Sequence, residues 1–361
     1  MPTTDRFPPE RLKDLREGRG SLLHRLFPGL VDKLPWRPLG IYPTPIEEIP
    51  AVSPNVRLFV KRDDLASAAY GGNKVRKLEH LLAAAAALDR KTLITMGGTG
   101  SNHAMATTIH GRTLGFDVEL ALYDQPITPH VERSLQIFPA AGATVHFGGG
   151  LPGAFRLARK RFVALRDAGE RPFFIMVGGT SRLGCVGHVT AGLELAAQVA
   201  RGDLPEPDVL FVPLGTCGTA AGLVAGLALA GLGTQVAAVR VAERFAANGI
   251  VVRMLAQDVI DYLHRLDPSV PRIRIGFDRF DVVPGYLGSG YGVATAAADA
   301  AVAWAAPRLS LETTYSGKAL AAALDMARWS GTPQTFLFWN TYNSAPLLQT
   351  PENSSLSTKD L

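Results

Sequence analysis

The sequence is poor in the features that mark a membrane protein, a metal site or a disulfide framework. Only two cysteines, Cys185 and Cys217, occur in 361 residues, and neither lies in a paired Cys or Cys/His spacing, so we expect neither disulfides nor a zinc site. No stretch reaches the ~20 uninterrupted apolar residues of a membrane span, and the N-terminal sequence lacks the apolar core of a signal peptide. These features predict a cytoplasmic protein that binds no metal and no membrane.

Charged residues are also sparse and evenly spread. They make up 19% of the chain and leave a formal net charge of +5. No run of lysine and arginine is interleaved with aromatic residues, so we do not expect nucleic acid as a partner. With 47% hydrophobic residues, the chain is long enough for a large core divided between two lobes.

Short apolar runs rich in β-formers alternate with stretches of helical periodicity. Strands followed by helices of ~10–15 residues indicate βαβ units and a mostly parallel sheet. The fold class expected from this pattern is α/β. The predicted strands are 56–63, 92–98, 118–124, 144–149, 172–179, 208–215, 235–243 and 335–343.

One predicted helix begins with a lysine, an unfavourable place for a cation. The stretch AAYGGNKVRKLEHLL (68–82) combines paired glycines, a plausible N-cap in Asn73 and an apolar face, so Lys74 falls at the helix N-terminus. Cations are disfavoured at that end of the helix dipole. In one interpretation Lys74 is a solvated surface charge, as Arg76 and Lys77 would be. In the other, the helix end lowers the pKa of the amine so that it can attack a carbonyl and form a Schiff base.

The loop GGTGSNH (97–103) follows a predicted strand and opens a helix. Its glycines bring backbone N–H groups to a ligand, and Ser101, Asn102 and His103 add side-chain donors. Such a group of donors suits a carboxylate or a phosphate. An ordinary N-cap would need only one of these side chains.

A second loop, GTCGTAAG (215–222), has the same position after an apolar strand. It places the hydroxyls of Thr216 and Thr219 at a helix N-terminus, which suits a phosphate, although it is neither a P-loop nor a dinucleotide fingerprint. A phosphate loop together with a lysine able to hold an aldehyde predicts pyridoxal phosphate as the cofactor.

These motifs follow one another in a family-specific order. KRDDL, YGGNKVRKLE, GGTGSNH, GTCGTAAGL, GYGV and TYSGKAL occur in succession, and with them the chain resembles the tryptophan-synthase-β-like pyridoxal-phosphate enzymes. Within that group it is most similar to the D-cysteine desulfhydrase and 1-aminocyclopropane-1-carboxylate deaminase family. The resemblance implies fold type II, with two lobes of open, twisted, mostly parallel sheets flanked by helices, and a homodimer.

The same resemblance implies a division of the chain into two domains. The large, cofactor-binding domain would comprise residues 1–85 and 190–361 and would carry an N-terminal extension over residues 1–40. The small domain would comprise residues 86–189. The extension could fold over the active site or over a dimer partner.

The resemblance also implies a role for each matching residue. Lys74 would form the Schiff base, Lys77 would approach the cofactor phosphate, and Asn102 would lie beside the phenolic oxygen. Ser101 would contact the substrate and assist proton transfer. Further implied cofactor contacts are the phosphate loop Gly215, Thr216, Cys217, Gly218 and Thr219 and the pyridine-nitrogen partners Ser316 and Thr341. The substrate side would be lined by Asn102, His103, Tyr291 and Tyr315, with both tyrosines also taking part in catalysis. For His103, a role as a helix cap or as a support for other site residues is the alternative.

One position bears on the reaction. Where the cyclopropane-opening deaminases have a glutamate that keeps the pyridine nitrogen protonated, this chain has Ser316. A hydroxyl favours a largely neutral ring, which is adequate for removing an α-proton and expelling a good β-leaving group. We therefore expect β-elimination from a small amino acid such as D-cysteine, giving a 2-oxo acid and ammonia.

Other functions stay open at this point. A 1-aminocyclopropane-1-carboxylate deaminase, a β-replacement synthase and a catalytically silent cofactor-binding protein are the alternatives. The chain departs from the family at Cys217, where relatives usually have glycine, and at Asn340–Asn343, where relatives tend to have Thr-Gly-Gly. The bulk of Tyr342 is expected to reshape the pocket.

Overall fold

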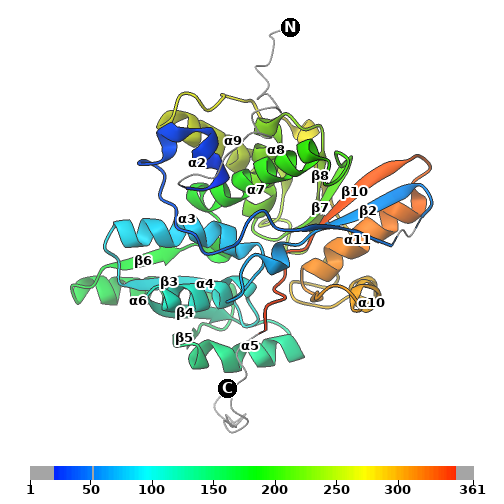
Figure 1. Cartoon of the computed structure of the whole chain (residues 1–361). Coiled ribbons are helices and arrows are strands. Elements are labelled where there is room, and N and C mark those ends of the chain that lie inside the picture. Colours follow the sequence, from blue (N-terminus) through cyan, green and yellow to red (C-terminus); the bar gives the residue numbers. More distant parts are fainter. Residues whose placement is uncertain (1–19, 51–52, 347–361) are drawn as a thin grey trace.

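Two α/β lobes are built around separate sheets in the computed structural model, which describes residues 20–50 and 53–346 (Figure 1). The first sheet has six strands in the order β1-β2-β10-β7-β8-β9, and only the β1–β2 pair is antiparallel. Its strands are β1 (Ile46–Ile49), β2 (Val56–Lys61), β7 (Val209–Leu214), β8 (Gln235–Arg240), β9 (Phe280–Val283) and β10 (Gln334–Trp339).

The second sheet has four strands, all parallel, in the order β5-β4-β3-β6. They are β3 (Thr92–Gly98), β4 (Asp117–Tyr123), β5 (Ala143–Phe147) and β6 (Pro172–Ile175). The predicted α/β class with mostly parallel sheets is therefore confirmed. All four strands fall inside the predicted small domain, whose boundaries at 86 and 189 stay a prediction.

Helices cover the sheets and connect their strands. Figure 1 shows α7, α8 and α9 in the upper half of the view and α4, α5 and α6 in the lower half. The α-helices are α2 (Leu22–Leu26), α3 (Lys74–Ala87), α4 (Asn102–Thr113), α5 (Pro129–Ala140), α6 (Leu151–Asp167), α7 (Arg182–Arg201), α8 (Gly218–Ala230), α9 (Gly249–Leu266), α10 (Ala296–Ala305) and α11 (Ser316–Trp329). The short 3-10 turns within the described residues are η1 (Pro28–Leu30), η2 (Asp63–Leu65), η3 (Val177–Gly179) and η4 (Phe277–Arg279).

Helix α7 lies in the core of the first lobe. By length and composition alone it could cross a membrane, yet 78% of its most apolar window is buried inside the protein. It packs against α3, α8 and α9, and small residues allow a close approach: a Cβ on Gly192 would lie 2.8 Å from the backbone of Gly226 on α8. The hydropathy of α7 is accounted for by this packing.

The described part of the N-terminal extension packs on the first lobe. Helix α2 contacts α7, and η1 contacts α9. The Lys33 ammonium donates a hydrogen bond of 2.7 Å to the carbonyl of Leu266, at the end of α9. Of the two alternatives for the extension, a position over the active site is not taken by residues 20–40, none of which lines the described cavity wall, and contact with a dimer partner stays a prediction. Residues 1–19 lie outside the described part of the chain.

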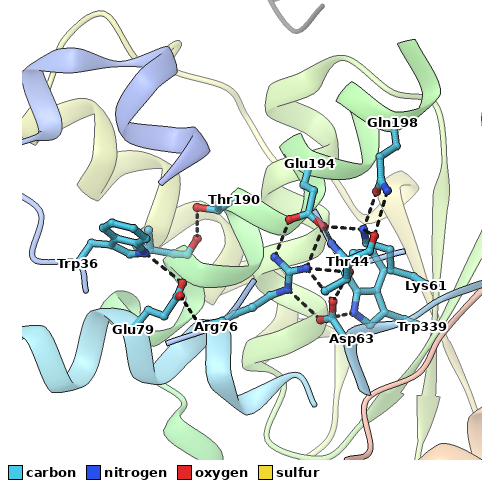
Figure 2. A network of polar contacts seen from close by, with 12 residues as sticks. Trp36, Thr44, Lys61, Asp63, Arg76, Glu79, Thr190, Glu194, Gln198 and Trp339 are labelled. Atoms are coloured by element: carbon cyan, nitrogen blue, oxygen red, sulfur yellow. Dashed lines mark hydrogen bonds and ion pairs between the residues drawn. The ribbon is translucent and has the colours of Figure 1, made fainter. Parts of the chain in front are cut away.

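A buried network of charged residues joins the elements of the first lobe (Figure 2). The Arg76 guanidinium of α3 donates to both oxygens of Asp63, at 2.7 and 2.9 Å, and to both oxygens of Glu194 of α7, each at 3.0 Å. The Lys61 ammonium of β2 lies 2.5 Å from Glu194, and the Trp339 indole of β10 donates to Asp63 at 2.7 Å. The network holds two cations and two carboxylates, so its charges balance.

The expectation that Arg76 and Lys77 are solvated is wrong. Their exposed fractions are 2% and 1%. Arg76 can stay charged although it is buried, because its guanidinium donates hydrogen bonds to the carboxylates of Asp63 and Glu194. Burial alone would raise the pKa of Glu194, but Arg76 and Lys61 outweigh it and lower that pKa to about 2.

Replacing Arg76 by leucine should destabilise the protein by ~3–5 kcal/mol, because it leaves two buried carboxylates with one cation. Urea unfolding at pH 7 measures this. The matched control is Arg57→Leu, which removes the exposed Arg57–Glu48 pair (56% and 47% exposed) and should change the free energy of unfolding by less than ~1 kcal/mol. Equal effects of the two substitutions would contradict a structural role for the network.

Glu79 holds the segment that leads from η1 to β1. Its carboxylate accepts hydrogen bonds from the Trp36 indole at 3.0 Å and from the backbone N–H groups of Leu39 at 3.0 Å and Gly40 at 3.2 Å. Burial raises the pKa of Glu79 to about 7. The folded protein therefore binds this proton more tightly than the unfolded chain.

The contribution of Glu79 to stability should consequently fall as the pH rises from 5 to 8. The contribution of Glu79 is fully present below its ordinary pKa of 4.5 and is lost as the pH passes about 7, and it amounts to at most ~3 kcal/mol. In Glu79→Gln this part of the pH dependence should disappear. Urea unfolding of both proteins at pH 5 and pH 8 isolates it, and parallel pH profiles would contradict the raised pKa.

Candidate active site

A single cavity of about 540 Å³ collects most of the predicted site residues. It lies where the carboxyl ends of parallel strands from both sheets meet, the usual position of ligand sites in open α/β sheets. The loops after β3, β4, β7, β8 and β10 all contribute to it. The predicted residues on its wall are Lys74, Ser101, Asn102, His103, Gly215, Thr216, Cys217, Gly218, Thr219, Tyr291, Tyr315 and Thr341.

Lys74 is the first residue of α3 and lines the cavity. Burial, together with the nearby Lys77 ammonium, lowers the pKa of its amine well below the ordinary value. Lys74 is therefore a cavity residue with a weakly basic, nucleophilic amine, and the solvated interpretation is wrong.

The segment before Lys74 differs from the expectation in one respect. Asn73 occupies the N-cap position, but its side chain makes no cap hydrogen bond; its amide instead donates to the Thr219 hydroxyl at 2.9 Å. This contact connects the start of α3 to the phosphate loop. The glycines before Asn73 allow a close approach, since a Cβ on Gly72, which has a φ of +88°, would lie 2.7 Å from the carbonyl oxygen of Tyr342.

The GGTGSNH loop presents three side chains from the start of α4. The Ser101 hydroxyl oxygen accepts the N–H of Ala104 at 3.2 Å, so its hydrogen is free to donate. The Asn102 carbonyl oxygen accepts the Tyr70 hydroxyl at 3.2 Å, which leaves the Asn102 amide as a donor. Two donors at a helix N-terminus suit a carboxylate.

His103 is held in one tautomer by its neighbours. The Thr95 hydroxyl donates to the carbonyl of Ile175 at 2.9 Å, so it must accept a hydrogen bond from His103 Nε2–H at 3.0 Å. The second ring nitrogen, Nδ1, is then an acceptor, and it is buried without a partner among the described residues. Burial, with smaller contributions from Lys74 and Lys77, lowers the pKa of His103 well below its usual value, so the ring is neutral.

The loop after β7 turns sharply into α8. Cys217 has a φ of +66°, in the left-handed region that favours glycine, and its thiol donates to the carbonyl of Ala246 at 3.2 Å. A Cβ on Gly218 would lie 2.7 Å from the Thr180 hydroxyl and 3.0 Å from the Lys77 ammonium. The backbone at Gly218 therefore passes close to Thr180 and Lys77, an approach that the missing side chain of glycine permits, at the N-terminus of α8.

Two predicted cofactor contacts do not line the cavity. Lys77 lies behind Gly218, with its ammonium 2.9 Å from the carbonyl of Gly178, and burial lowers its pKa to about 8. Ser316 is fully buried, and its hydroxyl contacts the Glu312 carboxylate at 3.1 Å. Of the two predicted pyridine partners, only Thr341 reaches the cavity wall.

Three tyrosines lie together on the substrate side. Tyr291 and Tyr315 share a hydrogen bond through their hydroxyls, and the ring centroids of Tyr123 and Tyr291 lie 6.1 Å apart. Burial is the main cause that raises the pKa of all three, so their hydroxyls stay protonated at neutral pH.

Sequence reasoning missed Tyr123 and Glu243. Tyr123 ends strand β4 and lines the cavity, and its place at the carboxyl end of a predicted strand was a usable signal. Glu243 follows β8 and accepts the backbone N–H of Tyr291 at 3.2 Å. The predicted effect of Tyr342 on the pocket is not observed: its hydroxyl contacts His130 at 3.2 Å, and the residue is absent from the described cavity wall.

Residues 38–341 match the family model described as pyridoxal-phosphate dependent enzyme. The chain belongs to the pyridoxal-phosphate dependent enzyme family. It is an enzyme, and its cofactor is pyridoxal phosphate.

Relatives within the family carry several names. The chain is 35% identical to Nocardicin C-9' epimerase of Nocardia uniformis subsp. tsuyamanensis, with 85% of this chain and 92% of the relative covered. It is 29% identical to a putative 1-aminocyclopropane-1-carboxylate deaminase of Pyrococcus furiosus, with coverages of 88% and 95%, and 31% identical to D-cysteine desulfhydrase of Salmonella paratyphi C, with coverages of 78% and 85%.

The structural comparison agrees with the sequence comparison. The crystal structure of an ACC deaminase homologue aligns with a TM-score of 0.76 at 25% identity and covers 88% of this chain and 94% of that one. The protein is thus a pyridoxal-phosphate enzyme of the ACC deaminase and D-cysteine desulfhydrase group.

The cavity residues fit pyridoxal phosphate. The Lys74 amine can bond to its aldehyde, and the turn at Cys217 and Gly218 presents the N-terminus of α8 to the cavity, which suits its phosphate. The buried, unpartnered Nδ1 of His103 indicates a polar ligand in the same cavity. These individual assignments remain proposals.

The backbone at position 217 provides a test of the phosphate loop. Cys217→Gly should keep cofactor affinity, because glycine adopts a φ of +66° without strain. Cys217→Val should weaken it at least tenfold, because a β-branched side chain disfavours this conformation. Dissociation constants for pyridoxal phosphate from fluorescence titration of the apoenzymes measure the difference. Equal affinity of both variants would contradict the role of the loop.

Proposed function

We propose that this enzyme is a lyase that removes the α-proton of a small amino acid and expels its β-substituent, as a D-cysteine desulfhydrase does. The products are a 2-oxo acid, ammonia and the protonated leaving group, with one water consumed. Bound pyridoxal phosphate supplies an electron-withdrawing system that makes the α-proton acidic. The observation that carries the proposal is the lowered pKa of Lys74 in a cavity that also holds a pair of protonated tyrosines.

The described contacts support a distinct task for each group. Lys74, with its lowered pKa, is neutral often enough to accept a proton from Cα. Ser101 and Asn102 have free donors at the start of α4, which suit the substrate carboxylate. The protonated hydroxyl of Tyr315 or Tyr291 can donate to the leaving group.

Epimerisation is a second candidate, favoured by the relative named Nocardicin C-9' epimerase. It needs one group to take the α-proton and another to return a proton to the opposite face. Lys74 and the tyrosine pair line one cavity and have unequal affinities for protons, which suits such an exchange. The deaminase and β-replacement alternatives differ from both candidates in their products. The homodimer and the cytoplasmic location stay predictions.

Replacing Lys74 by alanine should abolish the covalent attachment of the cofactor and lower kcat at least ~10³-fold, because the base is removed. Borohydride reduction followed by peptide mass spectrometry should find the cofactor on Lys74 in the wild type and nowhere in the variant. Lys91→Ala is the matched control, since that ammonium belongs to a surface pair and is 72% exposed; it should behave as wild type. Attachment at another lysine would overturn the assignment.

A panel of amino acids separates the candidate reactions. Pyruvate and sulfide from D-cysteine support the lyase, 2-oxobutanoate from 1-aminocyclopropane-1-carboxylate supports ring opening, and recovery of the opposite enantiomer supports epimerisation. A product that forms only with an added thiol would indicate β-replacement. A cofactor-loaded protein without any turnover or exchange at Cα would contradict the proposal.

A further inference from the structure

The outer part of the cavity has a different character from the part around Lys74. Four residues, which we call the apolar rim, line it: Pro126 after β4, Leu151 at the start of α6, and Phe245 and Ala246 after β8. Two of them are large and open to solvent, since Phe245 is 74% exposed and Leu151 is 41% exposed. The rim thus combines apolar side chains from both lobes.

Both halves of the rim are anchored to the catalytic part of the cavity. The loop that carries Phe245 is held by the Cys217 thiol, which donates to the carbonyl of Ala246 at 3.2 Å, and by Glu243, which accepts the N–H of Tyr291 at 3.2 Å. Neither contact uses the ring of Phe245. Its exposure at the mouth of the cavity therefore results from a defined loop conformation.

Leu151 is positioned by the glycine loop between β5 and α6. The N–H of Gly148 donates to the carbonyl of Leu122, and the N–H of Asp124 donates to the carbonyl of Gly149, both at 2.8 Å. These bonds hold the start of α6 against the carboxyl end of β4, beside Tyr123. Leu151 and Tyr123 consequently line the same cavity.

The charges around the cavity limit what the rim can bind. Among the described lining residues the charged side chains are Lys74, Asp124 and Glu243, and His103 is neutral. Lys74 is the one cation among these described lining residues, and the carboxylates of Asp124 and Glu243 would repel an anionic side chain. An apolar group that covers Phe245 and Leu151 would remove their surfaces from water at no electrostatic cost.

We propose that the apolar rim binds the side chain of the substrate. The enzyme then prefers cysteine derivatives whose sulfur carries a bulky apolar group over cysteine itself. This inference rests on the proposed lyase function. For S-benzylcysteine the Cα–H and Cβ–S bonds break, the sulfur keeps the bonding electrons and takes a proton to leave as benzyl thiol, and water completes the release of pyruvate and ammonia. The rim would hold the benzyl group.

The test compares kcat/KM for S-benzyl-D-cysteine and D-cysteine by pyruvate release, with both L-isomers in parallel. The wild type should prefer the benzyl substrate at least tenfold, as expected for several added carbons in an apolar site. In Phe245→Ala and Leu151→Ala that preference should fall at least fivefold. Trp329→Ala is the matched control, because Trp329 is 88% exposed at the end of α11 and lies outside the described cavity wall; its preference should equal that of the wild type.

A second readout separates failure of the rim from failure of the lyase. Exchange of the α-proton in D₂O, followed by NMR, needs no leaving group and compares phenylalanine with alanine. Faster exchange of phenylalanine that depends on Phe245 would support the rim even if no pyruvate formed from any substrate. Normal lyase activity with a preference that ignores Phe245 and Leu151 would overturn it.

The remaining occupant to test is a second copy of the chain. Sedimentation of wild type and Phe245→Ala decides this. A variant that loses self-association while keeping the substrate preference would show that the rim is a subunit contact, and the inference would be overturned. Unchanged association with a lowered preference supports substrate binding.

Discussion

The Arg76 guanidinium is the group on which the site's geometry depends. It lies two residues after Lys74 and binds Asp63 and Glu194 with two hydrogen bonds each. Because a planar guanidinium with paired carboxylates tolerates little rotation, these bonds orient the first turn of α3. Through Lys61 and Trp339 the same network reaches β2 and β10, so the position of Lys74 is tied to the sheet.

The cavity exists because two sheets place the carboxyl ends of their strands toward each other. One sheet supplies the phosphate loop and Thr341, and the other supplies Ser101, Asn102 and Tyr123. Neither lobe alone contains all the groups that the proposed chemistry needs. Helix α3 contacts both α7 of the first lobe and α4 of the second, and it carries the lysine at the junction.

The phosphate loop illustrates how a departure from the family pattern is accommodated. Cys217 adopts a left-handed backbone that a glycine would accept more easily. Its thiol, however, donates to Ala246, and this contact ties the loop after β7 to the loop after β8. A residue with a less favourable backbone thereby connects the cofactor end of the cavity to its outer wall.

The sequence by itself determined the α/β class, the parallel strands and the three loops that meet in the cavity. Those features depend on local periodicity, glycine placement and short motifs such as YGGNK and GGTGSNH. Domain boundaries and residue roles were implied by resemblance and stay predictions.

Only the tertiary structure decided which charges are buried and which side chains reach the ligand. Arg76 and Lys77 were expected at the surface because the groups that bind them lie far away in the sequence. Glu194 accepts hydrogen bonds from Arg76, and the carbonyl of Gly178 accepts one from Lys77. Tyr123, Glu243 and Phe245 belong to the cavity, and Ser316 does not line it, because strand order and lobe packing set those distances. Burial and long-range pairing depend on how the chain is brought together in space, which local sequence patterns do not encode.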